Sequence, residues 1–381
     1  MGSLASVYLL SFFFTLHLAL PVYIGSSFLG TLVDERTIGL IYAAGAILAI
    51  FGLYLIPRLL RAMGDFEATL LFMGFETLAV FGIAMFEDPT VLITLFILSL
   101  VLVYLISFDL DVIVEGLSKE SSTGTIRGLY LTAGNVAWVL SPVLAAGILT
   151  NGDYWRVYLA AAVLFLPALI IFNKKLNRFK DPLYRVTPFF KTLREVIRRR
   201  DIRYIFGASF LLNFFFAWMV IYTPIYLHEH LGFDWGNIGV IFSIMLVPFL
   251  LLEAPLGRLA DKVWGEKEML SIGFVIIAVS TAAMAFVTDN SFFTWALLLF
   301  TTRVGASMVE VMVETYLFKK IKAGESHILS LHRSLRPLSY VIGPLIGAVA
   351  LTLLPFNYIF LVLGLITLFG LRFSLGIRDT K

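Results

Sequence analysis

Carboxylate side chains occur four residues apart at two places in otherwise apolar stretches of this chain. Asp111 and Glu115 form the first pair, and Glu310 and Glu314 form the second. Residues at this spacing share one face of a helix, and two like charges so close hinder each other's ionisation. Such a pair can take up and release a proton. In the alternative interpretation, Glu115 and Glu314 lie at helix ends and face water.

Further ionisable residues stand inside apolar runs, where a charge costs about 2.5–3.5 kcal/mol on insertion scales. We therefore expect them to line a cavity or to pair with one another. Arg303 precedes Glu310 by two helical turns and is a candidate for binding an anionic group. His17 is either a proton carrier or a partner in a hydrogen bond between helices. Asp109 and Glu76 complete this set.

Basic residues are concentrated at the start of the eleventh apolar run. His332 and Arg336 lie one helical turn apart, with Arg333 between them. We expect Arg333 or Arg336 to pair with Glu310 or Glu314. Such a pair would either hold two helices together permanently or break and re-form during a conformational cycle.

The composition indicates which elements carry these residues. The chain has 381 residues, of which 59% are hydrophobic and 14% are charged. Soluble domains are usually about 45–50% apolar and about 25% charged, so a soluble multidomain enzyme is excluded. Cysteine is absent, which excludes a disulfide framework and a thiolate metal site.

Twelve apolar runs predict an all-α integral membrane protein with twelve transmembrane helices, because helices satisfy their own backbone polar groups in lipid. Lys and Arg indicate the orientation. With both termini in the cytoplasm, only Arg36 and Arg156 fall in loops on the opposite side, which favours this orientation. We expect a multi-pass protein of the cell (inner) membrane. The runs span residues 4–28, 37–57, 67–86, 90–114, 127–149, 155–173, 204–227, 236–256, 268–287, 291–317, 329–353 and 356–377.

A central polar stretch divides the chain into three parts. We expect a first six-helix bundle over residues 1–173, a basic cytoplasmic linker over 174–203, and a second bundle over 204–381. From Pro188 onward, the linker places apolar residues at helical spacing with basic residues between them. This pattern predicts a short amphipathic helix on the inner leaflet, attracted to anionic lipid. The alternative is a solvated linker.

The two halves repeat each other at an offset of roughly 200 residues. Parallel repeats are related by an axis along the membrane normal, and their substrate sites lie near the midplane between the repeats. The matched segments, in chain order, are Ile38-Gly39-Leu40 with Ile238-Gly239-Val240, Arg58-Leu59 with Arg258-Leu259, Asp111–Glu115 with Glu310–Glu314, and Ser141-Pro142 with Gly343-Pro344.

One loop after the eighth run resembles a motif of the major facilitator superfamily. The sequence Gly257-Arg-Leu-Ala-Asp261-Lys262-Val-Trp-Gly265-Glu266-Lys is similar to that family's Gly-x-Leu-Ala-Asp-(Arg/Lys)-x-Gly-(Arg/Lys)-(Arg/Lys). It departs from the motif by one extra residue before Gly265 and by Glu266 in place of a basic residue. The resemblance extends over the whole chain and implies two six-helix bundles that work as a monomer.

The resemblance also implies roles for several residues. Asp261 would dock near the start of the fifth helix and hold the cytoplasmic side closed. The first-half copy has Arg61 where the acid should stand, so its contact would differ, for example a pair with Glu325. The fifth helix is similar to the Gly-x-x-x-Gly-Pro pattern of the family's exporters. The helix-bend residues of the two halves are Ser141, Pro142, Gly343 and Pro344.

These features predict a secondary active transporter that works by alternating access. The first hypothesis is proton-coupled export of an amphipathic organic compound, because aromatic residues form 15% of the chain and suit amphipathic or cationic solutes. Proton-coupled or facilitated uptake of a small polar or anionic solute is the alternative. The chain has no Walker-type Gly-x-x-x-x-Gly-Lys-Ser/Thr sequence, so ATP hydrolysis is not expected.

Two rival classes of protein are also compatible with an apolar helical chain. A membrane-embedded transferase needs a catalytic cluster on sizeable loops, and no His-Glu-x-x-His pattern occurs, so no enzyme activity is expected. The other rival is a non-transporting sensor. The expected partners are a small-molecule substrate, protons or another coupling ion, and membrane lipids. We expect no cofactor, no metal and no nucleic acid.

Overall fold

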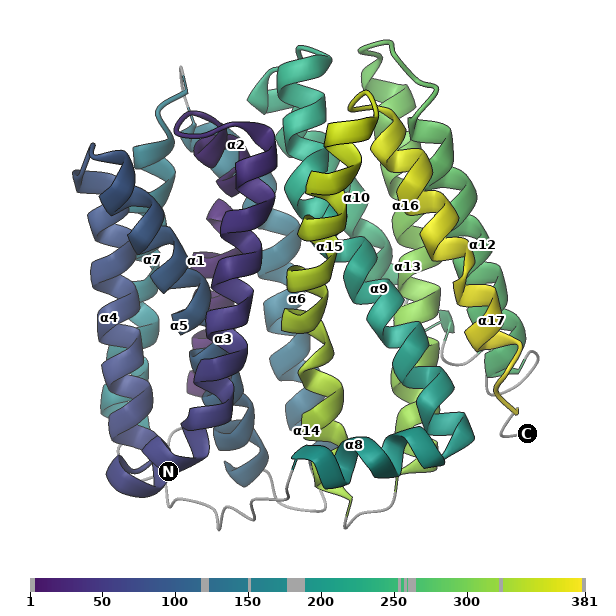
Figure 1. Ribbon diagram of the computed structural model, residues 1–381. Coiled ribbons are helices and arrows are strands. Elements are labelled where there is room, and N and C mark those ends of the chain that lie inside the picture. Colours follow the sequence, from purple (N-terminus) through teal and green to yellow (C-terminus); the bar gives the residue numbers. More distant parts are fainter. Residues whose placement is uncertain are drawn as a thin grey trace. The chain divides into compact units, whose positions relative to one another are not determined.

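The computed structural model describes residues 4–117, 123–149, 152–176, 189–252, 255–256, 259, 265–321 and 325–378. In this part of the chain every regular element is a helix and none is a strand. The chain divides into two compact units, Met1–Val186 and Thr187–Lys381, each built from long helices (Figure 1). The predicted fold class, an all-α membrane protein, is confirmed.

The first unit packs its helices around a core that includes Phe14, Ile106, Phe165 and Phe172. The short helix α2 follows α1, and the remaining elements are long enough to form the bundle. Their bounds are α1 Leu4–Val22, α2 Gly25–Gly30, α3 Glu35–Met63, α4 Asp65–Met85, α5 Pro89–Leu117, α6 Thr123–Ile148 and α7 Tyr154–Lys175.

The second unit begins with α8, which lies crosswise to the long helices of its own unit (Figure 1). A π-helical turn, η1, extends α9. The bounds are α8 Phe189–Arg198, α9 Arg200–Ile225, η1 Tyr226–His230, α10 Trp235–Leu251, α12 Glu266–Met284, α13 Phe292–Lys320, α14 Ser326–Arg333, α15 Leu335–Leu353, α16 Tyr358–Leu368 and α17 Gly370–Ser374.

Nine helical segments among the described residues are long and apolar enough to cross a membrane. Three further apolar helices are shorter: Thr132–Ile148, Trp235–Leu251 and Tyr358–Ser374. Each of the twelve predicted runs overlaps one of these segments. Large apolar side chains such as Phe75, Phe293 and Leu353 are exposed on the long helices, as expected for surfaces that face lipid.

The same pairs of helices pack together in the two units. In the first unit α1 packs on α6, α3 on α5, and α4 on both α5 and α7. In the second unit α9 packs on α15, α10 on α13, and α12 on both α13 and α16. The order of the elements is therefore repeated, which agrees with the internal sequence repeat.

The repeat also includes a helix cap. Asp34 precedes α3 and accepts hydrogen bonds from the backbone N–H groups of Arg36 and Thr37. Asp234 precedes α10 and accepts from the N–H of Asn237. A carboxylate here satisfies donors that the helix leaves unpaired. The hydroxyl of Thr37 also donates to Asp34 and lowers the pKa of that carboxyl group.

Helices α12 and α13 approach each other closely at two glycines. A Cβ atom built on Gly305 would lie 2.7 Å from the backbone oxygen of Gly273, and one on Gly273 would lie 2.9 Å from the oxygen of Gly305. Small residues allow this approach between membrane helices. The two backbones leave no room for a side chain at either position.

We expect Gly305→Leu to lower the stability of the full-length protein by about 1–3 kcal/mol, because overpacking forces the two helices apart. The measurement is the thermal unfolding midpoint in detergent. Gly74→Leu is the control, because a Cβ at Gly74 meets nothing within 4 Å. Equal unfolding midpoints for Gly305→Leu and Gly74→Leu would contradict the close approach of α12 and α13.

Candidate functional site

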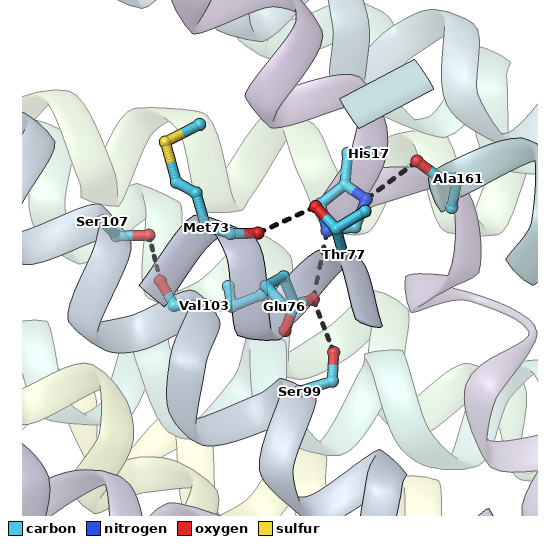
Figure 2. A network of polar contacts seen from close by, with 8 residues as sticks. All are labelled: His17, Met73, Glu76, Thr77, Ser99, Val103, Ser107 and Ala161. Atoms are coloured by element: carbon cyan, nitrogen blue, oxygen red, sulfur yellow. Dashed lines mark hydrogen bonds and ion pairs between the residues drawn. The ribbon is translucent and has the colours of Figure 1, made fainter. Parts of the chain in front are cut away.

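Four helices of the first unit bring polar groups together at His17 and Glu76 (Figure 2). Nε2 of His17, on α1, lies 3.1 Å from Oε1 of Glu76, on α4. Nδ1 of His17 lies 2.9 Å from the backbone oxygen of Ala161, on α7. The hydroxyl of Ser99, on α5, donates to the same Oε1 at 2.7 Å. His17 and Glu76 are 1% and 0% exposed.

The local sequence around His17 shapes this contact. The imidazole ring stacks on Phe165, with centroids 4.1 Å apart and the planes inclined by 14°. Four residues later comes Pro21, which has no N–H to donate to the carbonyl oxygen of His17. Helix α1 therefore lacks one backbone hydrogen bond at the residue that makes the contact.

Asp109 is a second buried acid of the first unit. It lies on α5, is 1% exposed, and its Oδ2 accepts a hydrogen bond of 3.1 Å from Thr69 on α4. Its Oδ1 has no hydrogen-bond partner among the described residues. Asp65, at the start of α4, is also buried. Glu76, Thr69 and Asp65 share one side of α4, because they are seven and four residues apart.

The acid pairs predicted from their spacing lie on continuous helices. Asp111 and Glu115 belong to α5, and Glu310 and Glu314 belong to α13. Asp111 and Glu310 are half-buried, whereas Glu314 is exposed. The side chain of Glu115 lies outside the described part of the chain. The role of these pairs in transport stays a prediction.

Arg303 is buried in the second unit, at 2% exposure on α13. Its guanidinium lies 4.9 Å from the ring centroid of Phe215 and 5.6 Å from that of Phe216, both on α9. A cation over aromatic faces is attracted by their quadrupoles, by about 2 kcal/mol or more when desolvated. This aromatic platform was not predicted from the sequence.

His332 and Arg336 differ in their surroundings. His332 lies in the last turn of the short helix α14 and is 8% exposed. Its ring contacts Phe206 at a centroid distance of 5.3 Å. A turn at Ser334 separates α14 from α15, and Arg336 on α15 is exposed. His332 is therefore buried and Arg336 is exposed, and the role of both residues in transport stays a prediction.

Hydroxyl groups contact the backbone at both helix-bend motifs, but in different ways. Pro142 of α6 cannot donate to the oxygen of Trp138, and the Ser141 hydroxyl donates to that oxygen instead, at 3.0 Å. In the second unit, the hydroxyl of Tyr222 donates at 3.0 Å to the oxygen of Pro344 itself, next to buried Gly343. Only the contact of Ser141 replaces the donor that a proline lacks.

Most of the predicted gating motif, including Gly257, Asp261 and Lys262, lies outside the described residues. Gly265 immediately precedes α12. Glu266, which departs from the motif, opens α12, and its Oε1 accepts a hydrogen bond of 2.8 Å from Nζ of Lys319. Glu266 is buried, and an acid is favoured at a helix N-terminus.

Ionic contacts fasten α8 to the rest of the second unit. Nη1 of Arg199 lies 2.9 Å from Oε1 of Glu325, and Nε2 of His327 lies 3.0 Å from Oε2 of Glu195. Arg61 is exposed at the end of α3, and its pairing with Glu325 stays a prediction. The contacts of α8 had no signal in the sequence beyond the charges themselves.

The described residues contain no group of three or more His, Asp or Glu side chains that could hold a metal ion. The residues that sequence reasoning missed are the uncharged partners of the buried acids. Ser99, Thr69 and the carbonyl group of Ala161 lie in apolar runs and contact residues far away in the chain. Nothing in the sequence pattern distinguishes them.

These features define a multi-pass helical membrane protein with ionisable side chains buried inside its bundles. Residues 236–380 match the family model of the Major Facilitator Superfamily, which supports membership of this superfamily and confirms the resemblance in the motifs. The matched segment covers the second unit from α10 onward. No curated protein matches the chain. The match and the apolar helices support a membrane transporter.

We expect Lys319→Met to lower stability more than Lys320→Met. Lys319→Met removes a charged donor from Glu266, whose side chain is 2% exposed, and the loss of a hydrogen bond to a charged group costs about 1.5–3 kcal/mol. Lys320 pairs with Asp201, whose side chain is 24% exposed and keeps access to solvent. Chemical unfolding of both variants in detergent measures the difference, and a larger loss for Lys320→Met would contradict the assignment.

Proposed function

We propose that this chain is a secondary active transporter that works by alternating access and couples proton movement to the export of an amphipathic organic compound. The superfamily match supports transport itself. The proposal of coupling rests on the acids buried among apolar spans. Apolar residues of similar size often stabilise such buried positions at least as well, which favours a functional role for these acids.

The observation that carries the coupling is the burial of Asp109. Its carboxyl group is 1% exposed, and one of its oxygens has a single hydroxyl partner while the other has none among the described residues. A carboxyl group in this setting exchanges a proton only when water reaches it. A conformational change that opens and closes the site would therefore connect the proton alternately with the two sides of the membrane.

The aromatic content supports an amphipathic substrate, since rings offer both apolar contact and attraction for cations. Arg303 favours the second candidate function, the transport of a small anionic solute. It is a cation buried in the second unit, and its guanidinium is a geometric match for a carboxylate or phosphate. The two candidate functions differ in the charge of the substrate, so transport of a cationic or of an anionic probe distinguishes them.

We also propose that α8 lies at the cytoplasmic surface of the cell membrane. Thr192 and Val196 are buried against the unit, whereas Phe189, Phe190 and Ile197 are exposed. Exposed Lys191, Arg194 and Arg198 border these apolar side chains. A helix with apolar and basic residues on its outer side suits a membrane surface that carries anionic lipid.

The transport proposal is tested in proteoliposomes with an imposed pH gradient, using ethidium as the amphipathic cation and lactate as the small anion. We expect gradient-driven movement of ethidium, and we expect Asp109→Asn to reduce it at least about tenfold, because a protein that cannot bind the proton cannot use its gradient. Fluorescence of ethidium and internal pH are recorded together.

Glu67→Gln is the matched control, because Glu67 is an exposed acid on α4. Gradient-driven movement of lactate with no movement of ethidium would replace export of a cation by transport of an anion. Movement of either probe that ignores the pH gradient in the wild-type protein would refute proton coupling.

The position of α8 is tested by attaching a fluorescent probe to a single cysteine, which is selective because the natural chain has none. In vesicles that contain phosphatidylglycerol, we expect a probe at Phe190→Cys to be strongly quenched by brominated lipid. A probe at Asp88→Cys, an exposed position between α4 and α5, should be quenched much less. Equal quenching at the two positions, or no dependence on anionic lipid, would contradict the proposal.

A further inference from the structure

The hydrogen bonds of His17 determine where its protons lie. A backbone carbonyl oxygen accepts and never donates, so the Nδ1 atom that contacts Ala161 must carry a hydrogen. The hydroxyl of Ser99 supplies its own hydrogen to Oε1 of Glu76. The remaining contact, from Nε2 of His17 to Oε1 of Glu76 at 3.1 Å, therefore needs one more hydrogen.

That hydrogen can be bonded to Nε2 of His17 or to Oε1 of Glu76, and the number of protons in the pair is the same in both cases. On Nε2 it makes an imidazolium beside a carboxylate, and on Oε1 it makes a neutral imidazole beside a carboxylic acid. In both forms the pair as a whole is neutral and contains one exchangeable proton. Neutrality is what allows two ionisable side chains to be 1% and 0% exposed within apolar helices.

Loss of the proton leaves His17 with one hydrogen for two contacts. With that hydrogen on Nδ1, the lone pair of Nε2 faces the lone pairs of the Glu76 carboxylate, and with it on Nε2, the lone pair of Nδ1 faces the oxygen of Ala161. In either tautomer one contact becomes repulsive and the pair carries a net negative charge without water, so α1 must separate from α4 or from α7, or water must enter. The proton is thus linked to the contact between two helices, which is what coupling to a conformational change requires.

Other buried acids connect this pair with the end of the unit. Asp65 stands at the start of α4, one helical turn before Thr69, which donates a hydrogen bond to Asp109 of α5. Thr69, the partner of Asp109, is seven residues before Glu76 on the same side of α4, or about 10 Å along the helix. Buried carboxyl groups therefore follow the interface of α4 with α5 from the helix end toward its middle.

We propose that the first unit contains a proton path along this interface, from Asp65 through Asp109 to an inner proton-binding site formed by His17 and Glu76. The proposal rests on the transport function proposed above and names the site of its coupling ion. Oδ1 of Asp109 and Oε2 of Glu76 are buried without a hydrogen-bond partner among the described residues, so each has a free position for an incoming proton or water.

The groups that face the inner site come from every packed helix. Helix α5 contributes the hydroxyl of Ser99, and α7 contributes the carbonyl of Ala161 and the ring of Phe165. Tyr158, also on α7, is buried three residues before Ala161. Among the described residues, no other charged side chain forms an ion pair with His17 or Glu76.

The second unit repeats the helix packing but not this chemistry. At the repeat offset, His17 corresponds to the uncharged stretch from Phe216 to Met219, and Glu76 corresponds to the apolar stretch from Val275 to Ala278. If the fold needed a polar contact between these helices, both units would contain one. The pair therefore serves the chemistry of the first unit, because well-packed apolar residues stabilise such a contact as well as an ion pair does.

Infrared difference spectroscopy of the full-length protein in lipid, between acidic and alkaline buffer, tests whether the inner site exchanges a proton. We expect a buried carboxyl band that disappears with alkali and is absent in Glu76→Gln. In Ser99→Ala, which keeps both ionisable groups, the band should remain and should still disappear with alkali. Glu67→Gln should leave the band unchanged. A band that ignores pH, or that survives in Glu76→Gln, would overturn the proposal.

Transport then distinguishes a coupling site from a structural contact. We expect Glu76→Gln to abolish ethidium accumulation driven by a pH gradient while the downhill equilibration of ethidium stays within about twofold of the wild-type rate. Unchanged accumulation, or parallel loss of both processes, would overturn the assignment. The unfolding midpoint identifies variants that fail to fold, and for these Ser99→Ala replaces Glu76→Gln, with a shifted pH dependence expected.

The two proposals fail in different ways. If the wild-type protein moves neither ethidium nor lactate, the proposed transport function fails for these probes, yet the carboxyl band still reports whether His17 and Glu76 exchange a proton. If the wild-type protein couples transport to protons while the band ignores pH, the function stands and the inner site is wrong.

Discussion

The hydrocarbon core of a membrane contains no water, so each polar group within it must find its partner inside the protein. This requirement explains the long helices, which satisfy their own backbones. It also explains the local repairs, such as the hydroxyl of Ser141, which donates to the oxygen that Pro142 leaves without a helical partner. The buried ionisable groups are the most demanding case, because each needs a partner on another helix.

The two units share a packing order but differ in the chemistry that they bury. In the first unit, acids follow the interface of α4 with α5 and end at the contact of Glu76 with His17. In the second unit, Arg303 lies over two phenylalanine rings, and Glu266 is held by Lys319. The two units thus have duplicated geometry but different buried groups, acids with a histidine in one and an arginine over aromatic rings in the other.

The linker contains a helix, α8, that ionic contacts hold to the second unit. Helix α8 is held to its unit through Arg199 and Glu195, which pair with Glu325 and His327 near the start of α14. Exposed pairs of this kind contribute little stability singly, whereas several around one short helix fix its orientation. The apolar and basic residues on its outer side are thereby presented in a fixed direction, which is what a helix at a membrane surface needs.

The sequence by itself determined the class of protein, the positions of the helices and the internal repeat, because runs of apolar residues and matching spacings are local signals. It did not determine which buried groups meet. His17, Glu76 and Ala161 are separated by many turns, and the contact of Glu325 with Arg199 had no signal beyond the two charges. The reason is physical: membrane helices are apolar on the sides that face lipid and on those that face each other, so the pattern does not specify rotation about the helix axis. Only tertiary packing sets that rotation, and with it the partner of each buried charge.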